Sequence, residues 1–207
     1  MDVQARLPCI RSVILLNDFV AAGLGVLVLK RDDVVTLSSA SAIAGQPMVC
    51  VGAGTGLGEV SAAEVATRGV RDYEQVYMTW NKSTQEYDVH ASEGGMAAFS
   101  PSNDDEWRLR QFVARRSDNF VNIEGVVSGP GLVNTYDWVC SEAGASSTAA
   151  DAASVAALAV AGDSHATRAV STMVRVFGAG LRNAALHMMS GGGVYCPAPC
   201  NNTAFWY

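Results

Sequence analysis

MVCVGAGTGLGE, residues 48–59, is the stretch around which the chain is organised. Its apolar opening, Met48 to Val51, predicts a buried strand. Glycines then occupy every second position from Gly52 to Gly58, and they allow the backbone to come close to a ligand. Such a turn can direct backbone N–H groups at anionic oxygens. We therefore predict a strand, a glycine turn and a second strand that together hold phosphate, with an ordinary glycine-rich turn as the alternative.

The spacing of these glycines argues against two common nucleotide-binding loops. The dinucleotide fingerprint Gly-x-Gly-x-x-Gly requires glycine at position 57 or 59, where the chain has Leu57 and Glu59. The Walker loop requires a lysine next to its last glycine, and this stretch contains none. A Rossmann-type oxidoreductase is therefore disfavoured.

Composition describes an acidic globular chain. Its 207 residues, 49% of them hydrophobic, suffice for one large domain or two small ones. The net charge of −6 argues against an extended nucleic-acid surface. Five scattered cysteines predict a reduced, cytoplasmic protein, and the close pair Cys196 and Cys200 lacks the further ligands of a zinc site. Asn17 and Asp18 interrupt the apolar N-terminal run, so we expect neither a signal peptide nor a membrane span.

Hydrophobic periodicity and turn residues predict the order of the elements. We expect strands at 12–16, 34–37, 48–51, 75–80, 86–90 and 191–195, and helices at 19–29, 103–116, 132–140, 149–161 and 163–189. The first helix is apolar on all sides, which predicts that it is buried. Asn103 and Glu106 fit a capping box at the start of the second helix. Helices that cover strands in this way predict a layered α/β domain.

Two polar residues, Asn17 and Asp18, lie between the first predicted strand and the first predicted helix. In open α/β sheets, ligands bind beyond the carboxyl ends of strands, which makes Asp18 a candidate site residue. A carboxylate at this position also suits a helix cap and the positive end of the helix dipole. Both interpretations of Asp18 stay open at this point.

Four segments, in this order, resemble the bacterial-type glucokinases of the actin-like and hexokinase superfamily. They are LLNDF at 15–19, GAGTGLG at 52–58, EGG at 93–95 and SGPGLVN at 128–134. The resemblance runs from about Ser12 to Tyr195 and includes the two C-terminal helices. It implies an α/β fold of the actin-like ATPase (ribonuclease H-like) class, with one partial domain over residues 1–207. That domain would be the large lobe of a glucokinase, with most of the small lobe missing.

The family that the chain resembles phosphorylates the 6-hydroxyl of glucose with ATP and Mg²⁺. The resemblance implies that Asp18 accepts the hydroxyl proton and that Asn17, Glu93 and Glu124 hold the sugar. It implies that the ATP phosphates are held by the glycine stretch, through Gly52, Gly54, Thr55 and Gly56, and it names no protein ligand to the metal. Positioning and charge stabilisation dominate phosphoryl transfer, so one carboxylate near the nucleophile suits this chemistry. The partners would be glucose and ATP, without nucleic acid or membrane, and a homodimer is left open.

Three departures from the family pattern lower the activity that we expect. The family's Asp-x-Gly-Gly-Thr motif, which grips phosphate, occurs nowhere in this chain. Met96 stands where the bacterial pattern has a sugar-binding histidine, and Cys196-Pro-Ala-Pro-Cys200 stands where the family has an apolar strand and a glycine pair. The chain ends at Tyr207 without the family's closing helices. We expect an incomplete kinase with low or no turnover, and the alternative is a non-catalytic sugar- or nucleotide-binding remnant.

Overall fold

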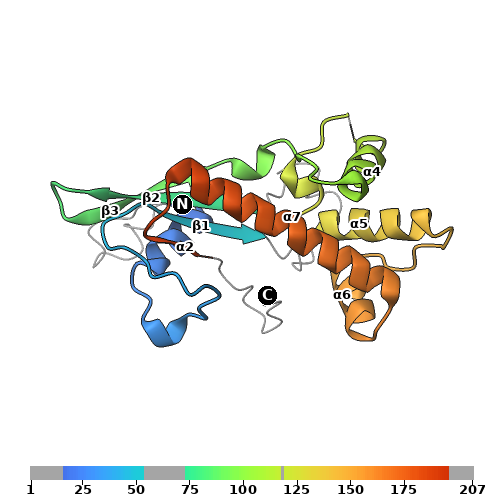
Figure 1. The fold of residues 1–207 in the computed structure, drawn as a ribbon, viewed down its shortest axis with the longest axis horizontal. Coiled ribbons are helices and arrows are strands. Elements are labelled where there is room, and N and C mark those ends of the chain that lie inside the picture. Colours follow the sequence, from blue (N-terminus) through green and yellow to red (C-terminus); the bar gives the residue numbers. More distant parts are fainter. Residues whose placement is uncertain (1–15, 54–72, 118, 196–207) are drawn as a thin grey trace, which may run out of the picture.

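A computed structural model describes residues 16–53, 73–117 and 119–195. Its centre is a four-stranded sheet in the order β3-β2-β1-β4, and a long helix, α7, crosses β1 (Figure 1). The strands are β1 (Met48–Ala53), β2 (Tyr73–Asn81), β3 (Glu86–Ser92) and β4 (Gly193–Tyr195). β2 is antiparallel to both β1 and β3, whereas β4 is parallel to β1. The sheet is therefore mixed, as in α/β folds that carry a hairpin beside parallel strands.

The described residues also form five α-helices and three short 3₁₀ turns. They are α2 (Asp18–Val26), η1 (Arg31–Asp33), η2 (Gly94–Met96), α4 (Asp104–Ala114), η3 (Ile123–Gly125), α5 (Gly129–Glu142), α6 (Ala152–Val160) and α7 (Ser164–Met188). Of these elements, α2 and α7 pack on the sheet, while α4, α5 and α6 lie toward one end of the molecule (Figure 1). Each α-helix begins at a side chain that accepts a backbone N–H, which is the usual way to satisfy the free donors of a helix start. The capping residues are Asn17, Asn103, Ser128, Asp151 and Asp163.

Strand β1 is buried on both faces because its alternating side chains enter two separate clusters. Val49 and Val51 join the larger core, to which α5, α6 and α7 contribute. Met48 and Cys50 point the other way and pack with β2 and with α2. A strand that is buried on both faces has a continuous run of apolar residues. The run from Met48 to Val51 therefore predicted this strand correctly.

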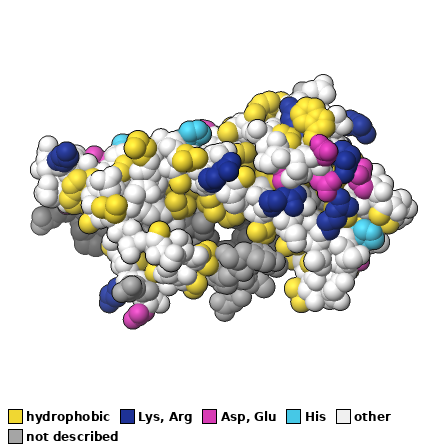
Figure 2. Space-filling model, viewed as in Figure 1, with side chains coloured by type: hydrophobic (Ala, Val, Ile, Leu, Met, Phe, Trp, Pro, Cys, Tyr) yellow, Lys and Arg dark blue, Asp and Glu magenta, His cyan; other side chains and the backbone are white. Residues whose placement is uncertain are grey.

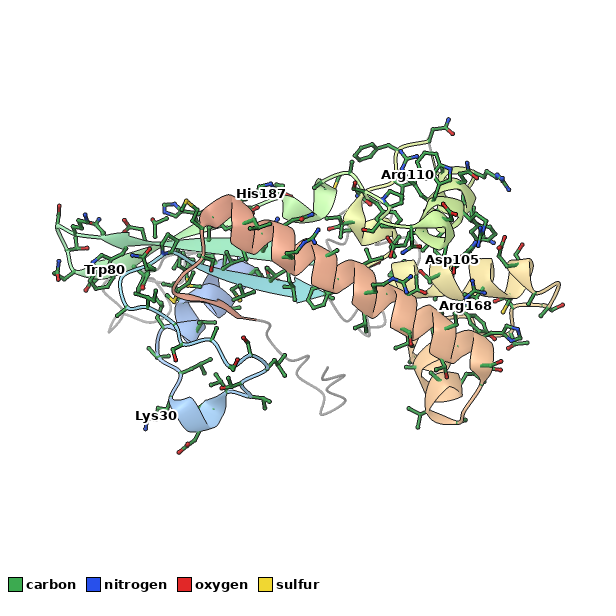
Figure 3. The ribbon with its side chains drawn as sticks, viewed as in Figure 1. Lys30, Trp80, Asp105, Arg110, Arg168 and His187 are labelled. Atoms are coloured by element: carbon green, nitrogen blue, oxygen red, sulfur yellow. The ribbon has the colours of Figure 1, made fainter. Side chains whose placement is uncertain are left out.

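Charged side chains join α4, α5 and α7 at the end of the molecule away from the hairpin. Asp105 on α4 lies beside Arg168 on α7, with 3.1 Å between Oδ2 and Nη2 (Figure 3). Asp105 also pairs with Arg108, which reaches Glu142 on α5 at 3.1 Å. Figure 2 shows charges of both signs mixed at this end. Most of these side chains are exposed, so each pair contributes little to stability.

The structure confirms most of the predicted elements and corrects three expectations. Residues 34–37 form no strand. Helix α2 ends at Val26 rather than at 29 and is not buried, because one of its faces packs on β2 and β3 while Leu24 stays 40% exposed. Glu106 does not return to the N–H of Asn103 as a capping box requires, since its carboxylate accepts the N–H of Ser102 instead.

Several predicted features lie outside the described residues. They are the strand at 12–16, the turn and return strand of the glycine hairpin after residue 53, and the pair Cys196 and Cys200. None of the helices that the structure describes combines the length and apolar character needed to cross a bilayer.

Candidate functional site

The predicted site residues within the described ranges gather at one end of the sheet. Gln75, near the start of β2, pairs with Val51 of β1 and with Ser92 of β3. The carboxyl ends of β1 and β3 therefore meet at the same sheet end. Gly52 follows Val51 in the chain and Glu93 follows Ser92, so both lie where these strands finish. Sheet ends of this kind are the usual place for ligands in open α/β folds.

Helix α2 begins at this sheet end, and its cap is Asn17 rather than Asp18. Oδ1 of Asn17 accepts the N–H groups of Phe19 and Val20, each at 3.0 Å. Asp18 is the first helical residue, and its Oδ1 lies 2.9 Å from the N–H of Phe19. Both side chains are exposed.

Helix α2 and strand β1 meet at Phe19 and Gly52. A Cβ atom placed on Gly52 would lie 2.7 Å from Cε2 of Phe19 and 2.8 Å from its Cζ, distances that real side chains do not adopt. A larger residue at this point of the buried strand would therefore force the phenyl ring to shift. The contact joins the glycine stretch to the residue after Asp18, and it gives Gly52 a packing role. Contact of Gly52 with phosphate stays a prediction, and Gly54, Thr55 and Gly56 lie outside the described residues.

Glu93 lies directly before the short turn η2, which begins at Gly94. The turn is closed by two backbone bonds, from the N–H of Met96 to the carbonyl of Glu93 at 3.0 Å and from that of Ala97 to Gly94 at 3.1 Å. The side chain of Gln75 lies against Gly94, in the space that a side chain at this position would need. The turn that carries Glu93 therefore rests directly on the buried Gln75.

The turns that carry Glu93 and Glu124 are held together. The N–H of Ile123 donates to the carbonyl of Ala97 at 2.9 Å, and Ala98 and Asn122 form an isolated β-bridge. Nδ2 of Asn122 also donates to Sδ of Met96 at 3.4 Å. Turns η2 and η3 are thus neighbours, although 29 residues separate the starts of these two turns.

Ser128 fixes the turn of Glu124 to the start of α5. Its buried hydroxyl donates to the carbonyl of Glu124 at 2.6 Å and accepts the N–H of Gly131 at 2.8 Å. Nδ2 of Asn134 donates to the carbonyl of Gly125 at 3.3 Å. The segment SGPGLVN therefore supports the turn of Glu124. This supporting role was missed in the sequence, where the segment indicated a helix start and the family resemblance, because its partners are backbone atoms of a preceding turn.

Whether this end of the sheet can hold a metal ion depends on which side-chain donors lie there. In the three described ranges, no group of three or more acidic, histidine or cysteine side chains could hold a metal ion. A Mg²⁺ ion in a kinase site keeps several waters and is held largely through substrate phosphates and one or two carboxylates. Among the described residues, the donors present therefore suit an ion that arrives with a nucleotide rather than one held by a cluster of protein side chains.

Solved glucokinases have the same fold. The structure of a glucokinase from an Antarctic psychrotroph matches with a TM-score of 0.73 at 21% identity, over 87% of this chain and 51% of that one. The glucokinase of Balamuthia mandrillaris, solved in complex with glucose, matches with a TM-score of 0.60 at 22% identity, over 81% and 42% of the two chains. The fold is therefore the α/β fold of the actin-like ATPase and hexokinase class.

Sequence comparison narrows the class to one family. The glucokinase family model matches residues 3–72 and 76–197. A glucokinase of Nostoc sp. is 30% identical over 203 residues, which cover 87% of this chain and 54% of the relative. A glucokinase of Stenotrophomonas maltophilia is 31% identical over 80% of this chain and 45% of the relative. The chain belongs to the glucokinase family, and it spans about half the length of the curated relatives it matches.

Proposed function

We propose that this chain carries the sugar site and the catalytic base of an ATP-dependent glucose kinase. The observation that supports the proposal most is the meeting of four separate segments at one sheet end. They are the start of α2, the end of β1, the turn η2 and the turn η3. Membership of the glucokinase family makes the phosphorylation of glucose the reaction to test first.

Asp18 is the proposed base. Its carboxylate is exposed at the start of α2, so a sugar hydroxyl can approach it within hydrogen-bond distance. Oδ1 of Asn17 accepts the hydrogen bonds of the helix cap. Its Nδ2 group can therefore donate to the oxygen of a neighbouring sugar hydroxyl. The cap bonds also hold the Asn17 side chain in one orientation, so this donor is positioned before the sugar arrives.

Glu93 and Glu124 are the proposed acceptors for the remaining sugar hydroxyls. An ionised carboxylate only accepts hydrogen bonds, and a hydroxyl donates one, so two carboxylates on adjoining turns suit a polyol. The bonds between η2 and η3 keep the two turns in a constant relation. Fixed turns reduce the entropy lost when the sugar binds.

ATP is the proposed phosphoryl donor. We propose that its phosphates are held by the glycine stretch through Gly52, Gly54, Thr55 and Gly56. A bound Mg²⁺ ion would neutralise charge on the transferring phosphoryl group. Asp18 and the end of β1 lie close together through the contact of Phe19 with Gly52, which supports a shared place for sugar and nucleotide.

Ligand binding and turnover are measured separately, because the chain spans about half of its relatives. Calorimetry with glucose, with ATP–Mg²⁺ and with both measures binding, and a coupled assay measures glucose 6-phosphate. We expect glucose to bind and to raise the melting temperature of the chain. Binding without product would support the non-catalytic sugar-binding alternative. If neither ligand binds, the proposed function is wrong for this chain.

A further inference from the structure

Gln75 is a buried polar residue with an unpaired oxygen. Its side chain is 7% exposed, and its Oε1 has no hydrogen-bond partner among the described residues. A buried acceptor without a partner costs folding free energy, and native structures contain few of them. Folding stability alone therefore does not explain why this position of β2 carries an amide.

The side chain of Gln75 points to the same face of the sheet as Val51 and Tyr77, which contact the larger core. There it lies against the turn η2, in the space that a side chain on Gly94 would need. Glu93 is the residue directly before Gly94 in the chain. A change in the shape or polarity of the Gln75 side chain is therefore transmitted first to the backbone that carries the Glu93 carboxylate.

We propose that Gln75 is a positioning residue for sugar binding, which acts through Glu93. Its amide supports η2 from below and sets where the Glu93 carboxylate lies. The unpaired Oε1 is the cost of that support in the sugar-free protein, as at other functional positions where a local rule is broken. This inference rests on the proposed function, since it takes Glu93 as a ligand of glucose.

Gln75→Met tests the inference, because methionine keeps the length and the unbranched shape of glutamine while removing both polar atoms. We expect the sugar-free variant to melt roughly 2–4 °C higher, since a buried unpaired acceptor is lost. We expect its affinity for glucose to fall about tenfold, because the turn is no longer held in place. Gln111→Met on the exposed face of α4 is the matched control, and it should change neither quantity.

A double-mutant cycle with Glu93→Gln shows whether the effect passes through Glu93. We expect Gln75→Met to weaken glucose binding in the normal background and to add nothing once Glu93 is replaced. ATP binding should be equal in all four proteins.

The outcomes separate this inference from the proposed function. If the unmodified chain binds glucose and Gln75→Met binds it equally well, the positioning role is wrong while the proposed function stands. If Gln75→Met weakens glucose binding as much in the Glu93→Gln background as in the normal background, the inference is also wrong, because Gln75 would then act through another residue. A variant that melts lower and keeps its affinity would make Gln75 a purely structural residue. If the unmodified chain binds no glucose, the proposed function fails and this inference fails with it.

Discussion

The phenyl ring of Phe19 lies over Gly52, in the space that any larger side chain there would need. A Cβ on Gly52 would approach the ring to 2.7 Å. Phe19 is the second residue of α2, and Gly52 is near the end of the buried β1, so this contact joins the helix start to the strand end. Asp18 is the residue before Phe19, and its place depends on the same contact.

Gly52→Ala should therefore destabilise the chain and disturb the start of α2. Overpacking of this kind costs about 1–3 kcal/mol, measured as the free energy of unfolding in urea. Gly25→Ala in helix α2 is the matched control. A Cβ at Gly25 meets nothing within 4 Å, so this substitution should raise stability by up to about 1 kcal/mol. Adding Phe19→Leu to Gly52→Ala should recover part of the loss. Equal stability of Gly52→Ala and the unmodified chain would contradict this packing.

The two residues at the start of α2 should affect different properties. We expect Asn17 to matter mainly for stability and Asp18 mainly for turnover. Asn17→Ala removes the cap bonds to Phe19 and Val20 and should cost about 1 kcal/mol. Asp18→Asn removes one charge at the positive end of the helix and should cost only about 0.3–1 kcal/mol. On the proposed mechanism, however, Asp18→Asn abolishes phosphoryl transfer and leaves glucose affinity largely intact, which a coupled assay and calorimetry check. A variant that keeps the normal rate would remove Asp18 as the base.

Ser128→Ala should lower the affinity for glucose and should also destabilise helix α5. The hydroxyl bridges the carbonyl of Glu124 and the N–H of Gly131, so its loss removes a helix cap and releases the turn of Glu124. We expect a loss of about 1 kcal/mol in stability and a lower affinity for glucose. Asp151→Ala is the control, because it removes the cap of α6 and should leave glucose affinity unchanged. Loss of stability alone in Ser128→Ala would confine the residue to a structural role.

Glu106 should make the chain sensitive to acid. Burial acts to raise the pKa of its carboxyl, but the hydrogen bonds from Arg175 at 2.8 Å and from the N–H of Ser102 at 2.7 Å outweigh it and hold the pKa below the ordinary value of 4.5. The folded chain thus binds this proton more weakly than the unfolded chain. The stabilisation is complete above the ordinary value and is lost as the pH falls through the lower pKa of the folded state.

Urea unfolding at a series of acidic pH values measures this contribution. Glu106→Gln should lower stability by on the order of 1 kcal/mol at neutral pH and flatten the loss of stability below about pH 4.5. Glu142→Gln is the control, since the pair of Glu142 with Arg108 is partly exposed and should contribute little. An unchanged slope in Glu106→Gln would show that another group controls the acid response.

Elements with a strong local signal were predictable, and those that depend on distant partners were not. The strands predicted at 75–80 and 86–90 correspond to β2 and β3, which pair as a hairpin. The burial of α2 was predicted wrongly, because an apolar helix sequence does not say how many of its faces meet another element. The capping box at Asn103 was half right. Asn103 accepts the N–H of Glu106, but the Glu106 carboxylate is held by Ser102 and by Arg175, 69 residues away.

The sequence by itself determined the four strands of the sheet, the approximate helix starts and the family, because these depend on side-chain periodicity, local caps and short motifs that neighbouring residues encode. Only the tertiary structure decided that Phe19 lies on Gly52, that Gln75 supports Gly94, and that the turns of Glu93 and Glu124 are joined. These contacts join residues far apart in the chain. The physical reason is that such pairs fit through shape and direction, which become defined only when the sheet has assembled.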